Sequence, residues 1–231
     1  MNNATLITGG STGIGAATAQ RLLKRGHRVA ITGRDPEKLV AFANRQASGA
    51  DLMTLPGDTS DPADVQAAVT TTIQAFGRLD NVIINAGFSL PGALTDHTPE
   101  AMRAMVLTNV LGPALVVRAT VPHLKDTRGR IVIIGSVAGV KHTPGNLYSV
   151  TKWAAHALAE NTRMAVTGDG IGVTLIAPGK VDTPFWDSRG GTPPGPAMTA
   201  ENIADSILFA LDQPEGMDIN HIQMRPIGQT N

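Results

Sequence analysis

Residues 4–15 read ATLITGGSTGIG: a short apolar run, a glycine-rich turn and the start of a helical pattern. Glycines let a backbone approach a pyrophosphate closely, and the N-terminus of the following helix favours its negative charge. The glycine spacing is GxxxGxG and no Gly-Lys-Ser/Thr follows, which excludes a P-loop. A tight connection without a ligand is the alternative. In an alternating strand–helix pattern the turn predicts dinucleotide binding, by Gly9, Ser11, Thr12, Gly13, Ile14 and Gly15.

The same strand-then-helix order continues along the chain. Apolar, β-branched runs predict strands near 4–8, 28–33, 51–55, 80–84, 130–135, 171–176 and 219–224. Helical patterns lie between them, near 13–26, 36–47, 61–76, 99–124, 147–167 and 199–212. The alternation predicts an α/β fold, Rossmann-like and doubly wound, with a parallel seven-stranded sheet in the order 3-2-1-4-5-6-7 and helices on both faces. Because no long linker divides the chain, we expect a single domain over 1–231.

Helix boundaries carry their own signals. Three expected helices begin with a cap residue before proline, at Asp35-Pro36, Asp61-Pro62 and Thr98-Pro99. Gly26, Gly77 and Gly168 lie near expected helix ends, where left-handed conformations are needed. Between the sixth strand and the last helix, residues 188–197 are too rich in Gly and Pro for regular structure. We expect a mobile loop there.

Composition narrows the class of protein. The 231 residues are 42% hydrophobic and 16% charged, as in ordinary globular proteins. Nineteen basic residues balance nineteen acidic ones, without the basic clusters that bind nucleic acid or membrane surfaces. The chain has no cysteine, and its six histidines are scattered without ligand spacing, so we expect no metal. No run approaches 18 apolar residues and no charged leader precedes the first strand; we expect a soluble, cytoplasmic protein.

The residue after the second strand bears on the choice of cofactor. About 20 residues past the glycine turn, dinucleotide folds place the residue that reads the adenosine ribose. Gly33 stands there instead of an acid, and Arg34 follows it. An arginine suits a 2′-phosphate, so we predict NADP(H) over NAD(H). The alternative is that Arg34 is a solvated charge and that Asp35, which already precedes a helix as its cap, binds the ribose.

A second chemical signal surrounds the only tyrosine, Tyr148. Lys152 follows it by four residues and would share its helix face. A phenol has an unperturbed pKa of about 10, and a neighbouring ammonium lowers that pKa. Ser136, at the end of the fifth strand, could share a substrate oxygen with the phenol. This set predicts a proton donor to a carbonyl or an acceptor from an alcohol. The plain alternative is a half-buried tyrosine beside a solvated lysine.

Six motifs therefore stand in order along the chain. They are TGxxxGIG from Thr8, Asn85-Ala86-Gly87 after the fourth strand, Asn109 within a helix, Ser136 after the fifth strand, Tyr148-x-x-x-Lys152, and Pro178-Gly179 after the sixth strand. Together they resemble the short-chain dehydrogenase/reductase superfamily in its single-domain form, over essentially the whole chain. The resemblance implies an oxidoreductase that interconverts a small carbonyl compound and a secondary alcohol.

The resemblance also implies roles for the catalytic residues. Tyr148 would be the acid/base, and Lys152 would lower its pKa and hold the nicotinamide ribose. Ser136 would orient the substrate oxygen. Asn109 would bind a water that links Lys152 to solvent. The alternatives remain that Asn109 is a polar residue within a buried helix and that Ser136 is a turn residue.

Further positions are implied for the cofactor. Small residues would let it lie close in a groove formed by Asn85, Ala86 and Gly87. Asp58, after the third strand, would contact the adenine; alternatively it caps a turn. The loop after the sixth strand would cover the nicotinamide, through Pro178, Gly179, Val181 and Thr183, with the last two near the carboxamide.

The substrate is less defined. The C-terminal segment from Asp218 resembles that of the branch acting on small 3-hydroxy acids, which argues against a fatty-acyl carrier substrate. Phe185 and Trp186 are expected apolar walls and Arg189 an expected carboxylate anchor; alternatively Trp186 packs on the last helix. Relatives commonly pair through the helix that carries Tyr148, which implies a homodimer or homotetramer.

Three alternative functions stay open beside the leading one. They are a non-catalytic NADP(H)-binding regulator of the same fold, NAD-dependent alcohol oxidation, and enoyl reduction. Enoyl reductases usually space their Tyr and Lys further apart than four residues, which disfavours the last.

Overall fold

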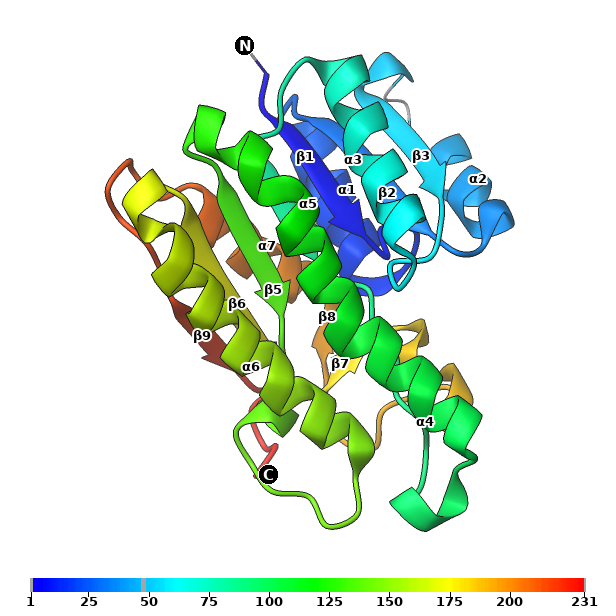
Figure 1. The fold of residues 1–231 in the computed structure, drawn as a ribbon. Coiled ribbons are helices and arrows are strands. Elements are labelled where there is room, and N and C mark those ends of the chain that lie inside the picture. Colours follow the sequence, from blue (N-terminus) through cyan, green and yellow to red (C-terminus); the bar gives the residue numbers. More distant parts are fainter. Residues whose placement is uncertain (1, 47–48, 231) are drawn as a thin grey trace.

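The computed structural model describes residues 2–46 and 49–230, and within these ranges seven strands form one parallel sheet (Figure 1). The strands are β1 (Ala4–Thr8), β2 (Arg28–Gly33), β3 (Leu52–Pro56), β4 (Asn81–Ile84), β5 (Arg130–Ile134), β6 (Gly172–Pro178) and β9 (His221–Met224). Their order is β3-β2-β1-β4-β5-β6-β9. The predicted fold class and strand order are confirmed, with β9 as the seventh strand.

Helices cover both faces of the sheet (Figure 1). They are α1 (Gly13–Lys24), α2 (Pro36–Asn44), α3 (Pro62–Phe76), α4 (Pro99–Val106), α5 (Gly112–Thr127), α6 (Leu147–Val166) and α7 (Ala200–Leu211). Residues of α1, α2 and α7, such as Leu22, Phe42 and Ile207, pack in one apolar cluster. Residues of α3, α5 and α6, such as Val69 and Val116, pack in a second cluster on the opposite face. Strands buried on both sides explain the continuous apolar runs in the sequence.

The helix caps follow the sequence signals closely. Side-chain oxygens cap three helices as predicted: Asp35 caps α2, Asp61 caps α3 and Thr98 caps α4. Gly26 (φ 79°) and Gly77 (φ 74°) are left-handed after α1 and α3. The expectation for Gly168 is wrong, because Gly170 takes the left-handed conformation there (φ 78°). Helix α2 ends at Asn44, and the end of the predicted helix 36–47 lies outside the described residues.

The predicted continuous helix 99–124 is interrupted. Between α4 and α5, residues Leu107–Leu111 form a π-helical turn in which the Gly112 N–H donates to the Leu107 carbonyl, five residues back. Pro113 has no N–H and cannot donate to the Asn109 carbonyl, as an α-helix would require. The turn widens at this point and re-aims the side chains that it carries.

By length and composition alone, the helical stretch Pro99–Thr127 could cross a membrane. It lies instead along the sheet between α3 and α6 (Figure 1). Its residues Val116 and Leu124 are buried in the apolar cluster of that face. The stretch is therefore a core helix of the fold.

The glycine- and proline-rich loop has more structure at its ends than predicted. Val181–Asp182 (β7) pairs with Met198–Thr199 (β8), which closes the loop at its base. A 3₁₀ turn covers Pro184–Arg189. Because all strands of the main sheet are parallel, this loop and the turns after β1, β2, β4 and β5 meet at one edge of the sheet.

Candidate active site

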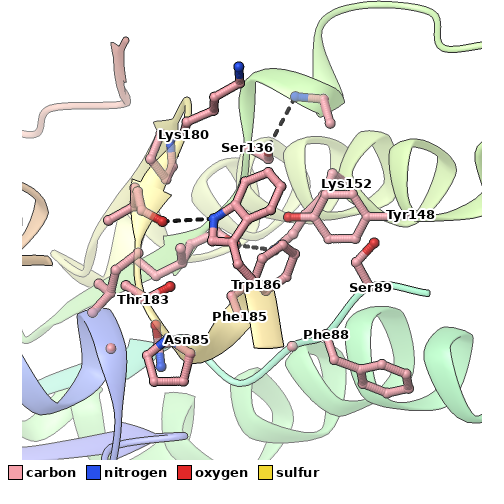
Figure 2. Close-up of a pocket in the computed structure, with 18 of the residues that line it drawn as sticks. Asn85, Phe88, Ser89, Ser136, Tyr148, Lys152, Lys180, Thr183, Phe185 and Trp186 are labelled. Carbon is pink, nitrogen blue, oxygen red and sulfur yellow. Dashed lines mark hydrogen bonds between the residues drawn. The ribbon is translucent and has the colours of Figure 1, made fainter. Parts of the chain in front are cut away.

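A cavity of about 860 Å³ opens at the carboxyl edge of the sheet, and most residues predicted from the sequence line it (Figure 2). They are Gly9, Thr12, Gly13, Ile14, Arg34, Asn85, Ala86, Gly87, Ser136, Tyr148, Lys152, Pro178, Gly179, Val181 and Thr183. Four predicted residues lie outside this lining: Ser11, Gly15, Asp58 and Asn109. The cavity extends from the glycine turn and Arg34 to Tyr148 and the loop after β6.

Ser136 stands at the end of β5 with an extended backbone (φ −172°, ψ 156°). Its hydroxyl oxygen accepts a hydrogen bond from the Ala138 N–H at 3.1 Å. The hydroxyl thus uses a lone pair on its own turn and keeps its proton for donation. Figure 2 shows Ser136 and the Tyr148 hydroxyl facing the cavity from the same side.

Tyr148 and Lys152 lie one turn apart on α6, which Asn146 caps by accepting from the Ser149 N–H. The Lys152 Nζ lies 5.7 Å from the centre of the Tyr148 ring. Lys152 is only 7% exposed, and its Nζ donates to the Ile134 carbonyl at 2.7 Å. Burial lowers the pKa of Lys152 to about 8. An ammonium held so close favours the ionised form of the phenol.

Asn109 lies in the π-helical turn, behind the cavity wall. Its amide oxygen accepts from the Phe88 N–H at 3.0 Å, and its amide nitrogen donates to the Phe88 carbonyl at 2.8 Å. The same nitrogen donates to the Thr151 hydroxyl at 3.1 Å. The side chain therefore ties the loop after β4 to α6, next to Lys152.

The glycine turn packs against the loop after β4. The Asn85 amide nitrogen donates to the carbonyls of Thr8 and Gly9, at 3.0 and 2.9 Å. A Cβ at Gly15 would lie 2.3 Å from the Gly9 carbonyl oxygen, so this glycine is needed for close packing of α1. In the described chain the N-cap residue Thr12 makes no side-chain cap bond, in contrast to Asp35 on α2. The N–H groups at the start of α1 are available to an anion.

Two cations line the cavity near the end of β2, where the adenosine end of a dinucleotide is expected. The Arg34 guanidinium stacks over the Phe88 ring, 5.8 Å from its centre, and Lys38, in the first turn of α2, also lines the cavity. Asp35 accepts from the N–H groups of Glu37 and Lys38 and is held as a helix cap. Sequence reasoning missed Lys38 and Phe88.

Asp58 is engaged in a turn of its own. Its carboxylate accepts from the N–H and the hydroxyl of Ser60, both at 2.8 Å. Burial raises the pKa of Asp58, but the Ser60 hydrogen bonds and the charge of Arg34 outweigh it, and the pKa lies below the usual value. The structure places Asp58 as a turn cap that does not line the cavity.

Aromatic rings cover the end of the cavity that Tyr148 lines. The Phe185 ring lies 5.6 Å from the Tyr148 ring, and Trp186 lies across the cavity between Thr183 and Tyr148 (Figure 2). The Trp186 Nε1 donates to the Val181 carbonyl at 2.9 Å, so this indole lines the cavity. The side chain of Arg189 lies outside what the structure describes.

Residues from the C-terminal segment and the β6 end close the same wall. The Gln229 side-chain oxygen accepts from the Lys180 N–H at 2.9 Å, and both residues line the cavity together with Ser89. None of the three carries a motif. Only the fold brings Gln229 back to the end of β6.

Comparisons with known proteins agree with this geometry. A family model described as short chain dehydrogenase matches residues 3–192. An uncharacterized oxidoreductase of Staphylococcus epidermidis is 33% identical over 226 residues, and the match covers 96% of each chain. An alcohol dehydrogenase of the archaeon Thermococcus sibiricus, complexed with 5-hydroxy-NADP, superposes with a TM-score of 0.91 at 26% identity, over 100% of this chain and 99% of that one. A 3-ketoacyl-(acyl-carrier-protein) reductase of Brucella melitensis, complexed with NADH, superposes with a TM-score of 0.88 at 25% identity, over 96% of each chain.

Proposed function

The chain belongs to the short-chain dehydrogenase/reductase family, and from that premise we propose that it interconverts a carbonyl compound and a secondary alcohol with NADP(H) as hydride carrier. One observation carries the proposal: Ser136, Tyr148 and Lys152 line one cavity together with the glycine turn. Without the glycine turn, the same three side chains would be a polar cluster lacking a hydride source. With it, the cavity can hold a hydride carrier beside a proton donor.

The residues of the cavity fit a dinucleotide. Pyrophosphate would be held at the N-terminus of α1, where the side chain of the N-cap residue Thr12 makes no cap hydrogen bond within the described chain. Gly87 lets the loop after β4 lie close to Asn109, because a Cβ there would lie 3.2 Å from the Asn109 amide oxygen. Lys152 would hold the nicotinamide ribose, and Pro178, Gly179, Val181 and Thr183 would cover the nicotinamide. The bound cofactor supplies or accepts the hydride.

The protein supplies the proton chemistry. In the reducing direction the Ser136 hydroxyl donates a hydrogen bond to the carbonyl oxygen, and Tyr148 transfers its proton to that oxygen. Lys152 stabilises the resulting phenolate. Pro113 cannot donate to the main-chain carbonyl of Asn109. This carbonyl accepts a hydrogen bond from a water, which passes a proton back towards Lys152. In the oxidising direction each step reverses, with the Tyr148 phenolate as base.

NADP(H) is the proposed cofactor because cations gather where the adenosine ribose would lie. Arg34 and Lys38 both line that end, while Asp35, the acid that could bind a ribose hydroxyl, is held as a helix cap. NAD(H) is the alternative cofactor, and the similar Brucella reductase complexed with NADH supports it.

A non-catalytic NADP(H)-binding regulator is the second candidate function. The aromatic cover of the cavity favours it, because Phe185 and Trp186 lie over Tyr148 where a substrate would enter. The complete set of Ser136, Tyr148 and Lys152 favours catalysis, since a regulator needs no proton donor. A spacing of four between Tyr148 and Lys152 also argues against enoyl reduction.

The proposal extends to assembly and location. Exposed apolar side chains on α6, among them Val150, Trp153 and Met164, support pairing of two copies in a homodimer or homotetramer. We propose a cytoplasmic enzyme acting on a small carbonyl compound.

The replacement Tyr148→Phe tests the mechanism. We expect it to keep NADPH affinity and to lower kcat by about 10²–10⁴-fold, the usual contribution of a general acid. Consumption of NADPH is followed with small 3-oxo acids, thioesters and cyclic ketones. Near-wild-type turnover in the variant would exclude Tyr148 as the acid. Binding of NADPH without turnover on any substrate, in the wild-type protein, would favour the regulator.

A further inference from the structure

His156 lies directly behind Ser136 and has no part in the chemistry above. It follows Lys152 by four residues on α6 and continues the helix face of Tyr148 and Lys152. Its Nε2 lies 3.0 Å from the Ser136 carbonyl oxygen. Because a carbonyl oxygen can only accept, Nε2 carries the proton and donates it.

The imidazole is fitted into the loop between two glycines. A Cβ at Gly135 would lie 2.9 Å from the His156 Nε2, and a Cβ at Gly139 would lie 2.6 Å from it. These glycines stand on either side of Ser136. The loop 135–139 is therefore shaped to admit this ring, and any other side chain at either glycine would displace it.

Helix α6 holds the strand-end loop through three donors. Ser149 donates from its hydroxyl to the Ala138 carbonyl at 2.7 Å, and Lys152 donates to the Ile134 carbonyl. His156 donates to the residue between them, Ser136. The Ser136 carbonyl also accepts from the Gly139 N–H at 2.9 Å, so both of its lone pairs are used. The two bonds fix the Ser136 main chain, from which the hydroxyl projects, and the Ala138 N–H holds the hydroxyl oxygen itself.

The charge state of His156 suits this role. Burial lowers its pKa, the bond to Ser136 raises it, and the charges of His221 and Lys152 lower it; the pKa lies below the usual value. The donor is then a neutral imidazole at pH 7, and no second cation forms beside Lys152. His221, on β9, packs edge-on against the His156 ring at 5.4 Å.

We propose that His156 is a positioning residue, which holds the Ser136 hydroxyl towards the substrate oxygen by fixing the Ser136 carbonyl. The proposal rests on the proposed role of Ser136 in carbonyl reduction. The distances and the paired glycines carry it.

A double-mutant cycle tests the coupling. His156→Leu is expected to lower kcat about 10–100-fold, as small misplacements of reacting groups do, with the NADPH dissociation constant unchanged. His156→Gln, whose amide can donate to the same carbonyl, is expected to recover most of the loss. In a Ser136→Ala background, His156→Leu should change kcat little further, because no hydroxyl remains to be positioned. An equal fold-loss in both backgrounds would overturn the proposal.

A matched variant separates the hydrogen bond from ring packing. His221→Leu removes the neighbouring ring and keeps the donor, so kcat should stay close to the wild-type value. If it falls as far as in His156→Leu, packing and not the hydrogen bond controls the site, and the proposal is wrong.

Amide exchange gives a readout that needs no turnover. The Ala138 and Gly139 N–H groups both donate to Ser136. His156→Leu should speed their hydrogen exchange relative to amides in β1, measured by NMR. Unchanged exchange at both amides would overturn the positioning role of His156, whether or not the wild-type protein reduces a carbonyl. If the wild-type protein reduces no carbonyl, that result would count against the proposed function alone.

Discussion

Lys152 carries a positive charge in a buried position, where loss of hydration disfavours the charged form. The side chain is 7% exposed, and burial lowers its pKa from 10.5 to about 8. At pH 7 the folded and unfolded chains both bind the proton, and the folded state carries the whole cost of the buried ammonium. Between pH 8 and 10.5 the unfolded chain binds more protons than the folded one, so this group's contribution to stability rises with pH. The site is held at the expense of stability at neutral pH.

Lys152→Met should therefore abolish turnover and stabilise the fold. The difference in pKa corresponds to a gain on the order of 3 kcal/mol at pH 7, less what the lost bond to Ile134 contributes. The gain should shrink as the pH approaches 10. Urea unfolding at pH 7 and pH 9.5 measures it. Lys125→Met, at an exposed pair with Asp169, is the control and should change stability by roughly 0–1 kcal/mol. A variant less stable than the wild type at pH 7 would contradict this account.

Single residues show what a sequence can and cannot reveal about this site. Tyr148, Lys152 and Ser136 are found because their spacing matches the helix period and a strand end. The predicted adenine contact of Asp58 stays a prediction; its carboxylate accepts from Ser60, a local bond that the sequence did not predict. His156 escaped notice because its partner is a backbone carbonyl, and no residue type in the sequence marks such a contact.

At the scale of elements, α1 depends on one missing side chain. Gly15 lies where a Cβ would meet the Gly9 carbonyl at 2.3 Å and the Asn85 amide nitrogen at 2.7 Å. Gly9 belongs to the turn that would hold the pyrophosphate, and Asn85 belongs to the loop after β4 that packs against this turn. Helix α1 can pack this closely against the turn and the loop after β4 only because residue 15 has no side chain.

Gly15→Ala should push α1 away from the glycine turn. We expect a loss of roughly 1–3 kcal/mol in stability, as for overpacked cores, and a weaker NADPH affinity. Thermal unfolding and NADPH titration measure the two effects. Gly168→Ala is the matched control, because a Cβ there meets nothing within 4 Å. Unchanged NADPH affinity in Gly15→Ala would show that the turn tolerates the shift.

Elements were predicted well wherever their signals are local. The seven strands of the main sheet fall within about two residues of their predicted ranges, because parallel strands read as continuous apolar runs. The π-helical turn was missed because apolar periodicity does not distinguish bonds four residues apart from bonds five apart. Pro113, in the middle of the predicted helix, was the signal that could have located it. The β7–β8 pair is too short for any pattern.

The whole molecule should report which cofactor it prefers. A ligand at about 100 times its Kd stabilises the folded state by about 2.7 kcal/mol. For a chain of this length that raises Tm by roughly 5–10 °C. We expect NADPH to raise Tm more than NADH does at the same concentration, because Arg34 and Lys38 face the adenosine end of the cavity.

Arg34→Ala should remove most of the difference between the two cofactors and leave the shift with NADH intact. Arg45→Ala, which removes an exposed charge just after α2, is the control. Differential scanning fluorimetry of the three proteins settles the matter. If Arg34→Ala keeps the full preference for NADPH, Arg34 does not bind the 2′-phosphate.

The Trp186 indole, hydrogen-bonded to the Val181 carbonyl, is also a fluorophore at the cavity wall. The chain holds two tryptophans, and the other, Trp153, stacks on His142 away from the cavity. Trp186 thus borders the cavity, while Trp153 does not line it. Binding in the cavity should therefore change the fluorescence of Trp186 more than that of Trp153, so occupancy can be followed by intrinsic fluorescence without an attached dye.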